Sequence, residues 1–366
     1  MARIPKQEKT IYELSQWQLI WRKFKKHKVA LGSSVVLVAM YAAAILAPFV
    51  SPYNIDERSD RTFQLPQRIL FWDDRGFSLR PFVHGLVQSR DPLSLSRVYT
   101  EDKTQRYYVL FFTRGWKYRL LGVIPGDLHL FGVEQGGSIN LFGTDELGRD
   151  LFSRVFHGAQ ISLSIGLVGI VISLVLGSLL GGVSGYFGGF ADLLIQRVIE
   201  FLVSIPTIPL WLTLSAAVPS DWPPVRVYFG ITVILATIGW TGLGRVVRGK
   251  LLELRTLDYV MAAKITGASE LRVILRHLLP GMTSYLIVSL TLSIPGMILG
   301  ETALSFLGLG LRPPTVSWGV LLQKSQNVQT LYLHPWILIP SLFVIVTVLA
   351  FNGMGDGLRD AADPYR

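Results

Sequence analysis

Charged residues are scarce in this 366-residue chain. They make up only 16% of it, whereas 50% of the residues are hydrophobic and the mean hydropathy is +0.42. An ordinary soluble domain is about 25% charged, and a soluble protein of this size would need a charged shell around its core. The composition therefore excludes a disordered or fibrous chain and argues against a soluble enzyme.

Cysteine is absent altogether, which excludes disulfides, thiolate metal sites and cysteine nucleophiles and leaves the redox compartment open. The six histidines are scattered, without an H-E-x-x-H motif, and G-x-S-x-G is also missing. The segment Gly244–Lys250 resembles a phosphate-binding loop. However, Leu251 stands where such a loop needs Ser or Thr for Mg²⁺, and an apolar run rather than a strand precedes it. We expect no nucleotide or metal site in this chain.

Long uncharged runs are the main feature that is present. A helix of about 20 apolar residues crosses the hydrocarbon core of a membrane, and the sequence predicts six such helices. The uncharged runs are 29–50, 161–191, 201–220, 227–244, 278–300 and 325–355. The first is too long for the apolar region of a signal peptide, so we interpret it as an uncleaved helix. Pro206 and Pro209 are expected to bend the third helix and Pro295 the fifth.

The net charge of +10 comes from two segments beside these runs. Residues 1–28 contribute +6 and residues 245–277 contribute +4, whereas residues 51–160 hold 14 basic and 13 acidic side chains. Lys and Arg gather on the cytoplasmic side of membrane proteins. A chain of six helices that starts inside also places 245–277 and the C-terminus inside, so both charged segments agree. The charge indicates orientation and does not indicate a nucleic-acid partner, which would need a basic folded face.

Two segments outside the runs have patterns of their own. Residues 11–28 predict an amphipathic helix lying in the membrane interface, since apolar residues such as Trp21 and Phe24 recur at helical spacing before a basic cluster. A plain basic tail is the alternative. Residues 51–140 form a polar, proline-punctuated insert with short strand-like runs. We expect a small β-rich domain there, and a sugar- or peptide-contacting surface is the alternative.

The second predicted helix carries a stripe of small residues. Gly177, Gly181 and Gly185 recur every four positions. This small-xxx-small pattern lets two helix backbones approach closely. It predicts tight packing of this helix in a bundle.

The segment between the fourth and fifth helices reads Met261-Ala262-Ala263, three residues, Gly267, nine residues and then His277-Leu278-Leu279-Pro280. This pattern resembles the EAA loop of ABC-importer permeases. Met261 and His277 depart from the family pattern, which has Glu and Ile there. In the family this loop is a short helix that seats on a cytosolic ATPase. Two alanines give it a low profile, a glycine turns the chain and a proline marks entry to the next helix. The resemblance assigns ATPase coupling to Met261, Ala262, Ala263, Gly267, Ala268, Ser269 and Pro280.

Three further segments look like signatures of one subfamily, the dipeptide/oligopeptide/nickel importers, and of the second of their two paired permeases. They are 141–158, 300–319 and 355–364. We expect Asp145, Arg149, Asp150 and Arg154 to form charge pairs outside the second helix. Helical rise places Glu301 about 28 Å from the start of the fifth helix, at an external rim or pore mouth. The signature residues on the external side are Gly143, Thr144, Asp145, Gly148, Arg149, Asp150, Glu301, Ser305, Pro314 and Trp318.

The resemblance implies an all-α membrane protein with the six-helix fold of type I ABC importer permeases, in a bacterial inner membrane with both termini cytoplasmic. This chain would bind no cofactor, because ATP and Mg²⁺ belong to its partners. Those partners would be a homologous permease, two cytosolic ATPases, a solute-binding protein and membrane lipid. The expected parts are an N-terminal helix (1–28), a first transmembrane helix (29–50), a periplasmic insert (51–157), a five-helix permease domain (158–355) with its coupling loop (256–280), and a cytoplasmic tail (356–366).

Alternatives remain at two levels. Peptide is the expected cargo, with oligosaccharide as the alternative; nickel is disfavoured because no His or carboxylate cluster lines a predicted span. A secondary transporter or channel would need charges inside the spans or inverted repeats, and neither is evident. A membrane enzyme or receptor would have to use the insert as its working domain.

Overall fold

The computed structural model describes residues 16–90, 92, 97–219 and 221–362. The chain divides into two compact units, each made of several segments. Unit 1 comprises Met1–Val38, Ile165–Leu304 and Ile345–Arg366, and unit 2 comprises Ala39–Ser164 and Ser305–Val344.

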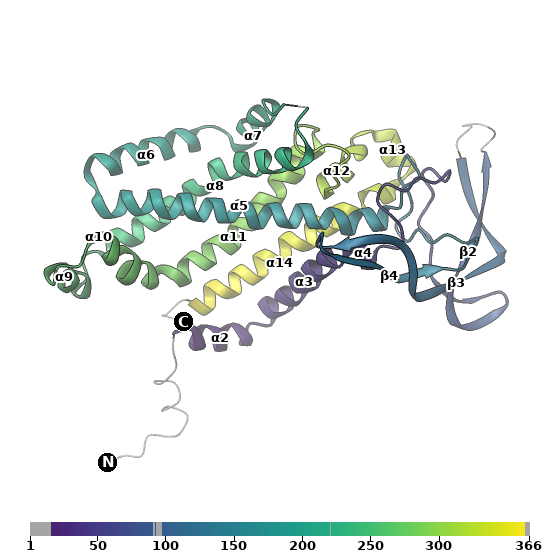
Figure 1. Cartoon of the computed structure of the whole chain (residues 1–366), viewed down its shortest axis with the longest axis horizontal. Helices are drawn as coiled ribbons and strands as arrows, with labels where there is room; N and C mark the ends of the chain where they lie inside the picture. Colours follow the sequence, from purple (N-terminus) through teal and green to yellow (C-terminus); the bar gives the residue numbers. More distant parts are fainter. Residues whose placement is uncertain (1–15, 91, 93–96, 220, 363–366) are drawn as a thin grey trace, which may run out of the picture. The chain divides into compact units, whose positions relative to one another are not determined.

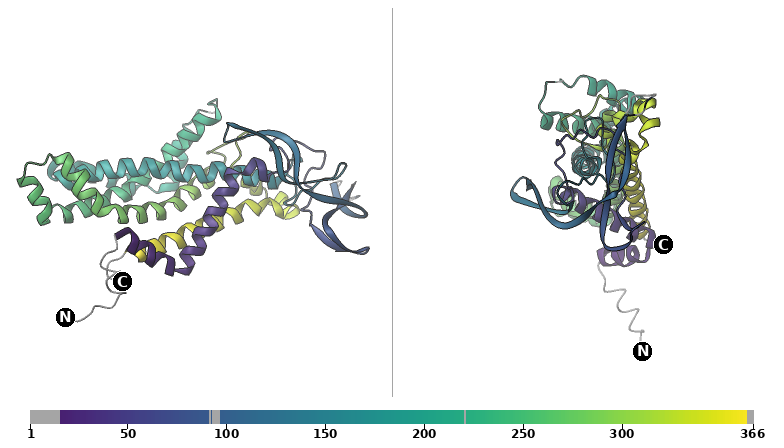
Figure 2. Two further views of the ribbon diagram at one scale, coloured as in Figure 1. Left: turned by 60° about the horizontal axis from the view of Figure 1, so that its bottom comes forward. Right: turned by 90° about the vertical axis from the view of Figure 1, so that its right-hand side faces the viewer.

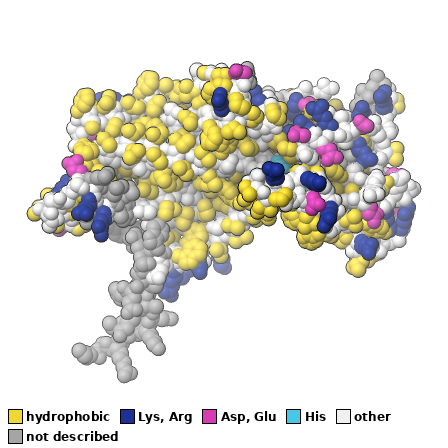
Figure 3. Space-filling model, viewed as in Figure 1, with side chains coloured by type: hydrophobic (Ala, Val, Ile, Leu, Met, Phe, Trp, Pro, Cys, Tyr) yellow, Lys and Arg dark blue, Asp and Glu magenta, His cyan; other side chains and the backbone are white. Residues whose placement is uncertain are grey.

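Five helices in the described part of the chain are long and apolar enough to cross a membrane. They are α3 (Lys28–Ile45), α5 (Leu151–Phe187), α8 (Pro224–Leu254), α11 (Leu279–Phe306) and α14 (Ile339–Ala362) (Figure 1). Hydrophobic side chains cover most of the helical surface in Figure 3. α5 begins before the predicted boundary at 157, and α14 extends through most of the predicted tail 356–366.

The predicted third helix, 201–220, is instead a bent pair. α6 (Gly189–Ser204) and α7 (Thr207–Ala216) meet at an angle of 89°. Proline lacks a backbone N–H and its ring collides with the preceding turn, so the predicted bend occurs at Pro206. The count of spans is therefore five, or six when this pair is one broken span.

In unit 1, α5 and α8 touch through the predicted glycine stripe. A Cβ atom on Gly181 would lie 2.9 Å from the Cα of Gly244, and one on Gly185 would lie 2.8 Å from the carbonyl oxygen of Arg248. Real Cβ atoms do not approach backbone so closely. The predicted close approach of two helix backbones is confirmed.

The N-terminal amphipathic segment is helical as α2 (Gln16–Lys26), and residues 1–15 of the prediction lie outside the described residues. Ile20 and Phe24 are buried and pack in one cluster with Ala361 of α14, and Figure 2 shows α2 and α3 beside α14. Trp21 on the same helix is exposed. Half of the apolar face is thus occupied by protein, which leaves only the rest for a membrane interface.

Unit 2 contains an antiparallel sheet in the order β1-β2-β3-β4, which fits the expected β-rich insert. Its strands are β1 (Leu70–Asp73), β2 (Gly76–Arg90), β3 (Arg97–Leu120) and β4 (Ile124–Val133). The first half of β3 pairs with β2 and its second half pairs with β4. Five short helical turns complete the unit: α4 (Ala47–Val50), α12 (Trp318–Leu322), η2 (Gln323–Gln326), α13 (Val328–Leu333) and η3 (Pro335–Leu338).

Candidate functional site

The predicted coupling loop forms a helix–turn–helix in unit 1. α9 (Asp258–Ile265) ends in a tight turn in which Gly267 has φ +81°. This left-handed conformation favours glycine, because it has no Cβ, and it closes the helix when the Ala268 N–H donates to the Ala263 carbonyl at 3.0 Å. The chain continues through α10 (Glu270–Arg272) and a π-helix (Val273–Leu278) into α11.

One face of this loop is anchored in a buried cluster. Val260 of α9 is fully buried, and Ala263 and Ala268 pack against the same cluster, which includes Leu251 of α8 and Val273. The two small side chains let α9 lie close to the ends of α8 and α11. A push on α9 would therefore be transmitted to these two helices.

The opposite face of α9 is apolar and exposed. Met261 is 49% exposed and Ile265 is 84% exposed, with Tyr259 and Ala262 also on the surface. The structure thus separates the predicted coupling residues: Ala263 and Ala268 face the bundle, whereas Met261 and Ala262 face outwards. Ser269 is exposed as well. Pro280 lies in α11, and its side chain is outside the described part.

Two charged side chains near α9 contact the C-terminal end of α5. The Arg255 guanidinium donates to the carbonyl oxygens of Gly185 and Tyr186 at 3.1 and 3.2 Å, which satisfies the free end of α5. Lys264 lies 4.9 Å from the centre of the Tyr186 ring. The Arg255 contacts join the end of α8 to the end of α5, and the Lys264 contact joins α9 to α5; the sequence pattern gave no sign of either.

The external signature of unit 2 begins with a loop held by buried backbone contacts. Gly143 and Gly148 both have left-handed φ values, +75° and +70°. A Cβ on Gly148 would overlap the Ser59 carbonyl. Thr144 between them is buried; its hydroxyl accepts from the Gln64 N–H at 2.8 Å. Only glycine fits the second of these turns, so its role in the signature is structural.

Asp145 forms the predicted charge pairs. Its carboxylate lies 2.8 Å from Arg149 Nε and 3.8 Å from Arg154 Nε, and it also accepts from the backbone N–H of Leu147 at 2.8 Å. One carboxylate thus closes the loop and forms ion pairs with two guanidinium groups. Arg154 itself is nearly fully buried.

Asp150 differs from the expected charge pairing. It is buried among polar groups: the Asn140 amide donates to it at 3.0 Å, and the Ser153 N–H and hydroxyl each donate at 2.7 Å. Burial raises its pKa to about 6, against the opposing effect of these hydrogen bonds. Ser153 belongs to the signature segment 141–158, but its contact with Asp150 was not expected, and Asn140 was not marked by the sequence at all.

Replacing Asp150 by asparagine should remove a pH dependence of stability. Because its folded pKa lies above the unfolded value of about 3.9, the folded state holds the proton more tightly. The free energy of unfolding then falls as pH rises from about 4 towards 6. The unfolding temperature of the parent should fall as the pH rises from about 4 towards 6, whereas that of Asp150→Asn should not show this fall. The unfolding temperature of the variant minus that of the parent should therefore increase over this range. If this temperature difference stayed constant from about pH 4 to about pH 6, the raised pKa that we attribute to burial of Asp150 would be contradicted.

Glu301 and Trp318 are both fully buried. Contrary to the expectation, the Glu301 side chain therefore does not face an open pore mouth, because the depth calculation considered only a height along the helix and not the direction in which the side chain points. Trp318 donates from its indole to the Val155 carbonyl at 3.0 Å and from its backbone N–H to the Ser162 hydroxyl at 3.1 Å. Ser305 is buried and accepts from a backbone N–H, whereas Pro314 is exposed.

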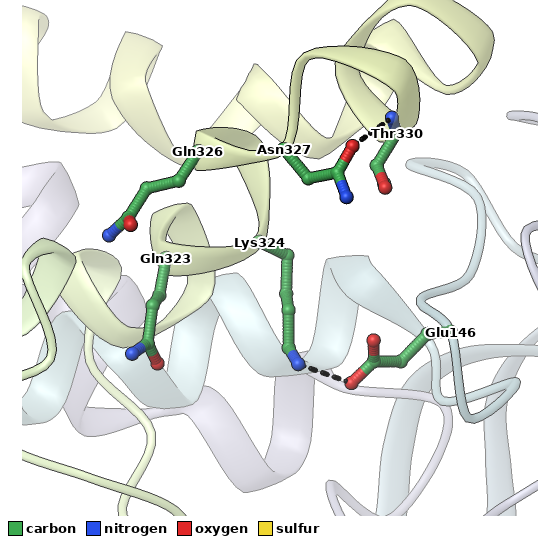
Figure 4. A pocket seen from close by; sticks show the side chains of 6 residues that line it. All are labelled: Glu146, Gln323, Lys324, Gln326, Asn327 and Thr330. Atoms are coloured by element: carbon green, nitrogen blue, oxygen red, sulfur yellow. Dashed lines mark hydrogen bonds and ion pairs between the residues drawn. The ribbon is translucent and has the colours of Figure 1, made fainter.

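A polar pocket of about 370 Å³ in unit 2 borders the signature loop. Figure 4 shows Lys324 of η2 reaching Glu146, and their charged atoms are 2.8 Å apart. The wall is completed by side chains from η2, α13 and the junction between them: Gln323, Gln326, Asn327 and Thr330. The sequence did not mark these amide-bearing residues, which are separated from Glu146 by more than 170 positions.

Comparison with known families accounts for most of the chain. The model of the binding-protein-dependent transport system inner membrane component matches residues 152–365. The N-terminal TM domain of oligopeptide transport permease C matches residues 15–66. Between these two regions lies most of the β insert.

Curated relatives match over nearly the whole length. The dipeptide transport system permease protein DppC of Bacillus subtilis is 31% identical over 96% of this chain and 86% of its own length. The glutathione transport system permease protein GsiD of Pectobacterium atrosepticum is 37% identical over 95% of this chain and 91% of its own. The oligopeptide permease OppC of Haemophilus influenzae is 40% identical over 62% of this chain and 70% of its own.

Among solved structures, the inward-facing MetNI methionine ABC transporter covers 57% of this chain and 95% of its own, with a TM-score of 0.44 and 17% identity. The assignment rests on the family model, which matches more than half of the chain, and on the full-length relatives. This chain belongs to the family of binding-protein-dependent transport system inner membrane components and is a permease subunit of an ABC importer.

Proposed function

We propose that this chain forms half of the translocation pathway of an ATP-driven peptide importer. A homologous permease would form the other half, with a solute-binding protein outside and two ATPase subunits inside. Peptide is the proposed cargo because full-length relatives are named as dipeptide and glutathione permeases. ATP and Mg²⁺ would be bound by the ATPases, and this chain would contribute no catalytic residue.

The observation that supports coupling is the two-sided geometry of α9. Its inner face, with Val260 and Ala263, is packed into the bundle, and its outer face presents Met261 and Ile265. A groove on an ATPase subunit would bury this outer face. Movement of the ATPases would then shift α8 and α11 and change the side on which the pathway opens. The free energy for alternating access would come from the partner subunits.

The proposed orientation follows from the charges. Segment 245–277, which contains α9, carries +4, and residues 1–28 carry +6. Both would lie in the cytoplasm, as would the C-terminus. The external signature loop and the β insert would then face the periplasm of a bacterial inner membrane, where the binding protein delivers its cargo.

Replacing Ile265 by aspartate tests this function. The side chain is 84% exposed, so the chain should fold normally, while a charge in the docking face should weaken ATPase association about tenfold, or ~1.4 kcal/mol. ATPase copurification and ATP-driven uptake of a labelled peptide into vesicles should both fall. The control is Met261→Glu, which restores the residue of the family pattern and should retain association.

Unchanged ATPase association in Ile265→Asp would contradict the docking role of α9. A separate outcome concerns the cargo. Vesicles with the complete transporter and its binding protein should take up peptide and not an oligosaccharide of similar size. Uptake of the oligosaccharide alone would reject the cargo assignment and leave the importer assignment intact.

A further inference from the structure

The closed end of the β3–β4 hairpin is apolar although it projects from a polar insert. Leu121 is 70% exposed and Val123 is 79% exposed, and Ile124 is also on the surface. Exposed basic side chains, Lys117 and Arg119, lie immediately before them in β3. Turns of hairpins that lie in water usually consist of polar residues and glycine. The exposed apolar residues at this turn therefore indicate an environment other than water.

The middle of the hairpin contacts the segment that follows a candidate membrane-crossing helix. His129 Nδ1 lies 3.0 Å from the carbonyl oxygen of Pro48 in α4, and the rings of Phe49 and Phe112 are 6.4 Å apart. α4 follows α3 after a single residue, Leu46. The middle of the hairpin therefore lies beside the end of this helix, and Figure 1 shows β4 running beside α4.

Two ring contacts give the direction of the hairpin along α5. Phe131, near the base, lies 5.5 Å from Phe152 in the first turn of α5. Trp116, nearer the closed end, lies 6.2 Å from His157, five residues further along that helix. The hairpin thus advances in the same direction as α5, towards the uncharged segment that begins at Ile161.

The remaining length is enough to reach that segment. Leu121 is five residues beyond Trp116 in the sequence, which spans up to about 16 Å in a strand. The uncharged part of α5 starts four residues after His157, or about 6 Å along the helix axis. The apolar end of the hairpin can therefore lie level with the outermost part of the hydrocarbon core.

We propose that this hairpin is a membrane anchor for the β insert. Leu121, Val123 and Ile124 enter the interfacial region of the leaflet on the insert's side, while Lys117 and Arg119 contact anionic lipid headgroups. Basic side chains beside an apolar tip are suited to this position, since their long stems can reach back to the headgroups. Entry is shallow, because unpaired strand edges are costly in the hydrocarbon core.

The anchor limits how far the insert can move during transport. The contact of His129 with Pro48 already holds the middle of the hairpin against α4. A second attachment at the closed end would keep β3 and β4 against the bilayer. The other side of the insert, with β1 and β2, would remain in water.

The absence of cysteine makes a site-specific test direct. Val123→Cys is labelled with an environment-sensitive fluorophore in the complete transporter, reconstituted in phosphatidylcholine–phosphatidylglycerol vesicles. The matched control is Leu79→Cys on β2, another apolar side chain that is 86% exposed. Lipids carrying a quencher near the headgroup should reduce the emission at position 123 by about half, as expected for an interfacial site. Aqueous iodide should quench only position 79.

Two results would overturn the proposal. Iodide quenching at position 123 equal to that at position 79 would place the hairpin in water. Protection from both quenchers would show that a protein subunit covers the tip instead of lipid. A label at Leu121→Cys repeats the measurement at an independent exposed position, so a local effect of one substitution cannot decide the outcome.

Discussion

Replacing Gly181 by valine is expected to destabilise the helical bundle by about 3 kcal/mol or more. Overpacking in a core costs ~1–3 kcal/mol when neighbouring side chains can move aside. Here a Cβ would overlap the carbonyl oxygen of Gly244 and lie 2.9 Å from its Cα. Because both atoms belong to the backbone of α8, the two helices must separate. The thermal unfolding midpoint in detergent is the measurement.

The control for this prediction is the adjacent residue. Gly182 lies on the same helix, but a Cβ there would meet only one side-chain atom, Leu251 Cδ1, at 4.0 Å. Gly182→Ala should leave the midpoint unchanged or raise it slightly, because alanine has the higher helix propensity by ~1 kcal/mol. Equal losses of stability in Gly181→Val and Gly182→Ala would contradict the role of close packing against α8, because a Cβ at Gly182 meets no backbone atom of that helix.

The glycine stripe of α5 also shows how much of the packing in the helical part could be predicted from the sequence. Its spacing predicts that α5 approaches another helix closely, which is confirmed, but nothing in the spacing identifies Gly244 of α8 as the contact. Charge-free runs located the helices because hydrocarbon excludes charge. They did not locate helix ends: α5 starts at Leu151, ten residues before the run. Residues at a helix end lie in water or in protein, where charge is tolerated.

The loop around α9 was recognised through its resemblance to a family motif, and its turn is formed by residues that are close in sequence. The turn at Gly267 and the small side chains of Ala263 and Ala268 lie within six residues of each other. Which of them are exposed was not predictable, since that depends on the buried cluster contributed by α8 and α11. The external loop depends instead on distant partners, such as Gln64 against Thr144. A single sequence contains no signal for such a pair.

The β insert was predictable only in part. Short strand-like runs indicated strands, and the sheet fits the expected β-rich insert, whereas the all-α class implied by the family resemblance is wrong for this part of the chain. The pattern could not show that a single strand, β3, pairs with β2 through Glu101 and with β4 through Phe111. A strand that serves two neighbours in succession has no distinct periodicity, because side chains alternate in the same way along its whole length.

Replacing Asp145 by alanine is expected to cost about 3 kcal/mol of stability, because removing one partner of a buried ion pair leaves the other charge without compensation. Arg154 is nearly buried, and its Nε lies 3.8 Å from the Asp145 carboxylate; Arg149 loses its contact at 2.8 Å. The Leu147 N–H also loses its acceptor. The signature loop should open, which lowers the unfolding midpoint and increases proteolysis between residues 141 and 150.

The neighbouring carboxylate provides the matched control. Glu146 also forms an ion pair, with Lys324 at 2.8 Å, but both side chains are substantially exposed. Exposed pairs contribute only about 0–1 kcal/mol, so Glu146→Ala should remain close to the parent in both assays. Comparable losses in Asp145→Ala and Glu146→Ala would mean that the loop depends on its total negative charge. A loss confined to Asp145→Ala would show instead that one buried carboxylate holds the start of α5 through two guanidinium groups and a backbone N–H.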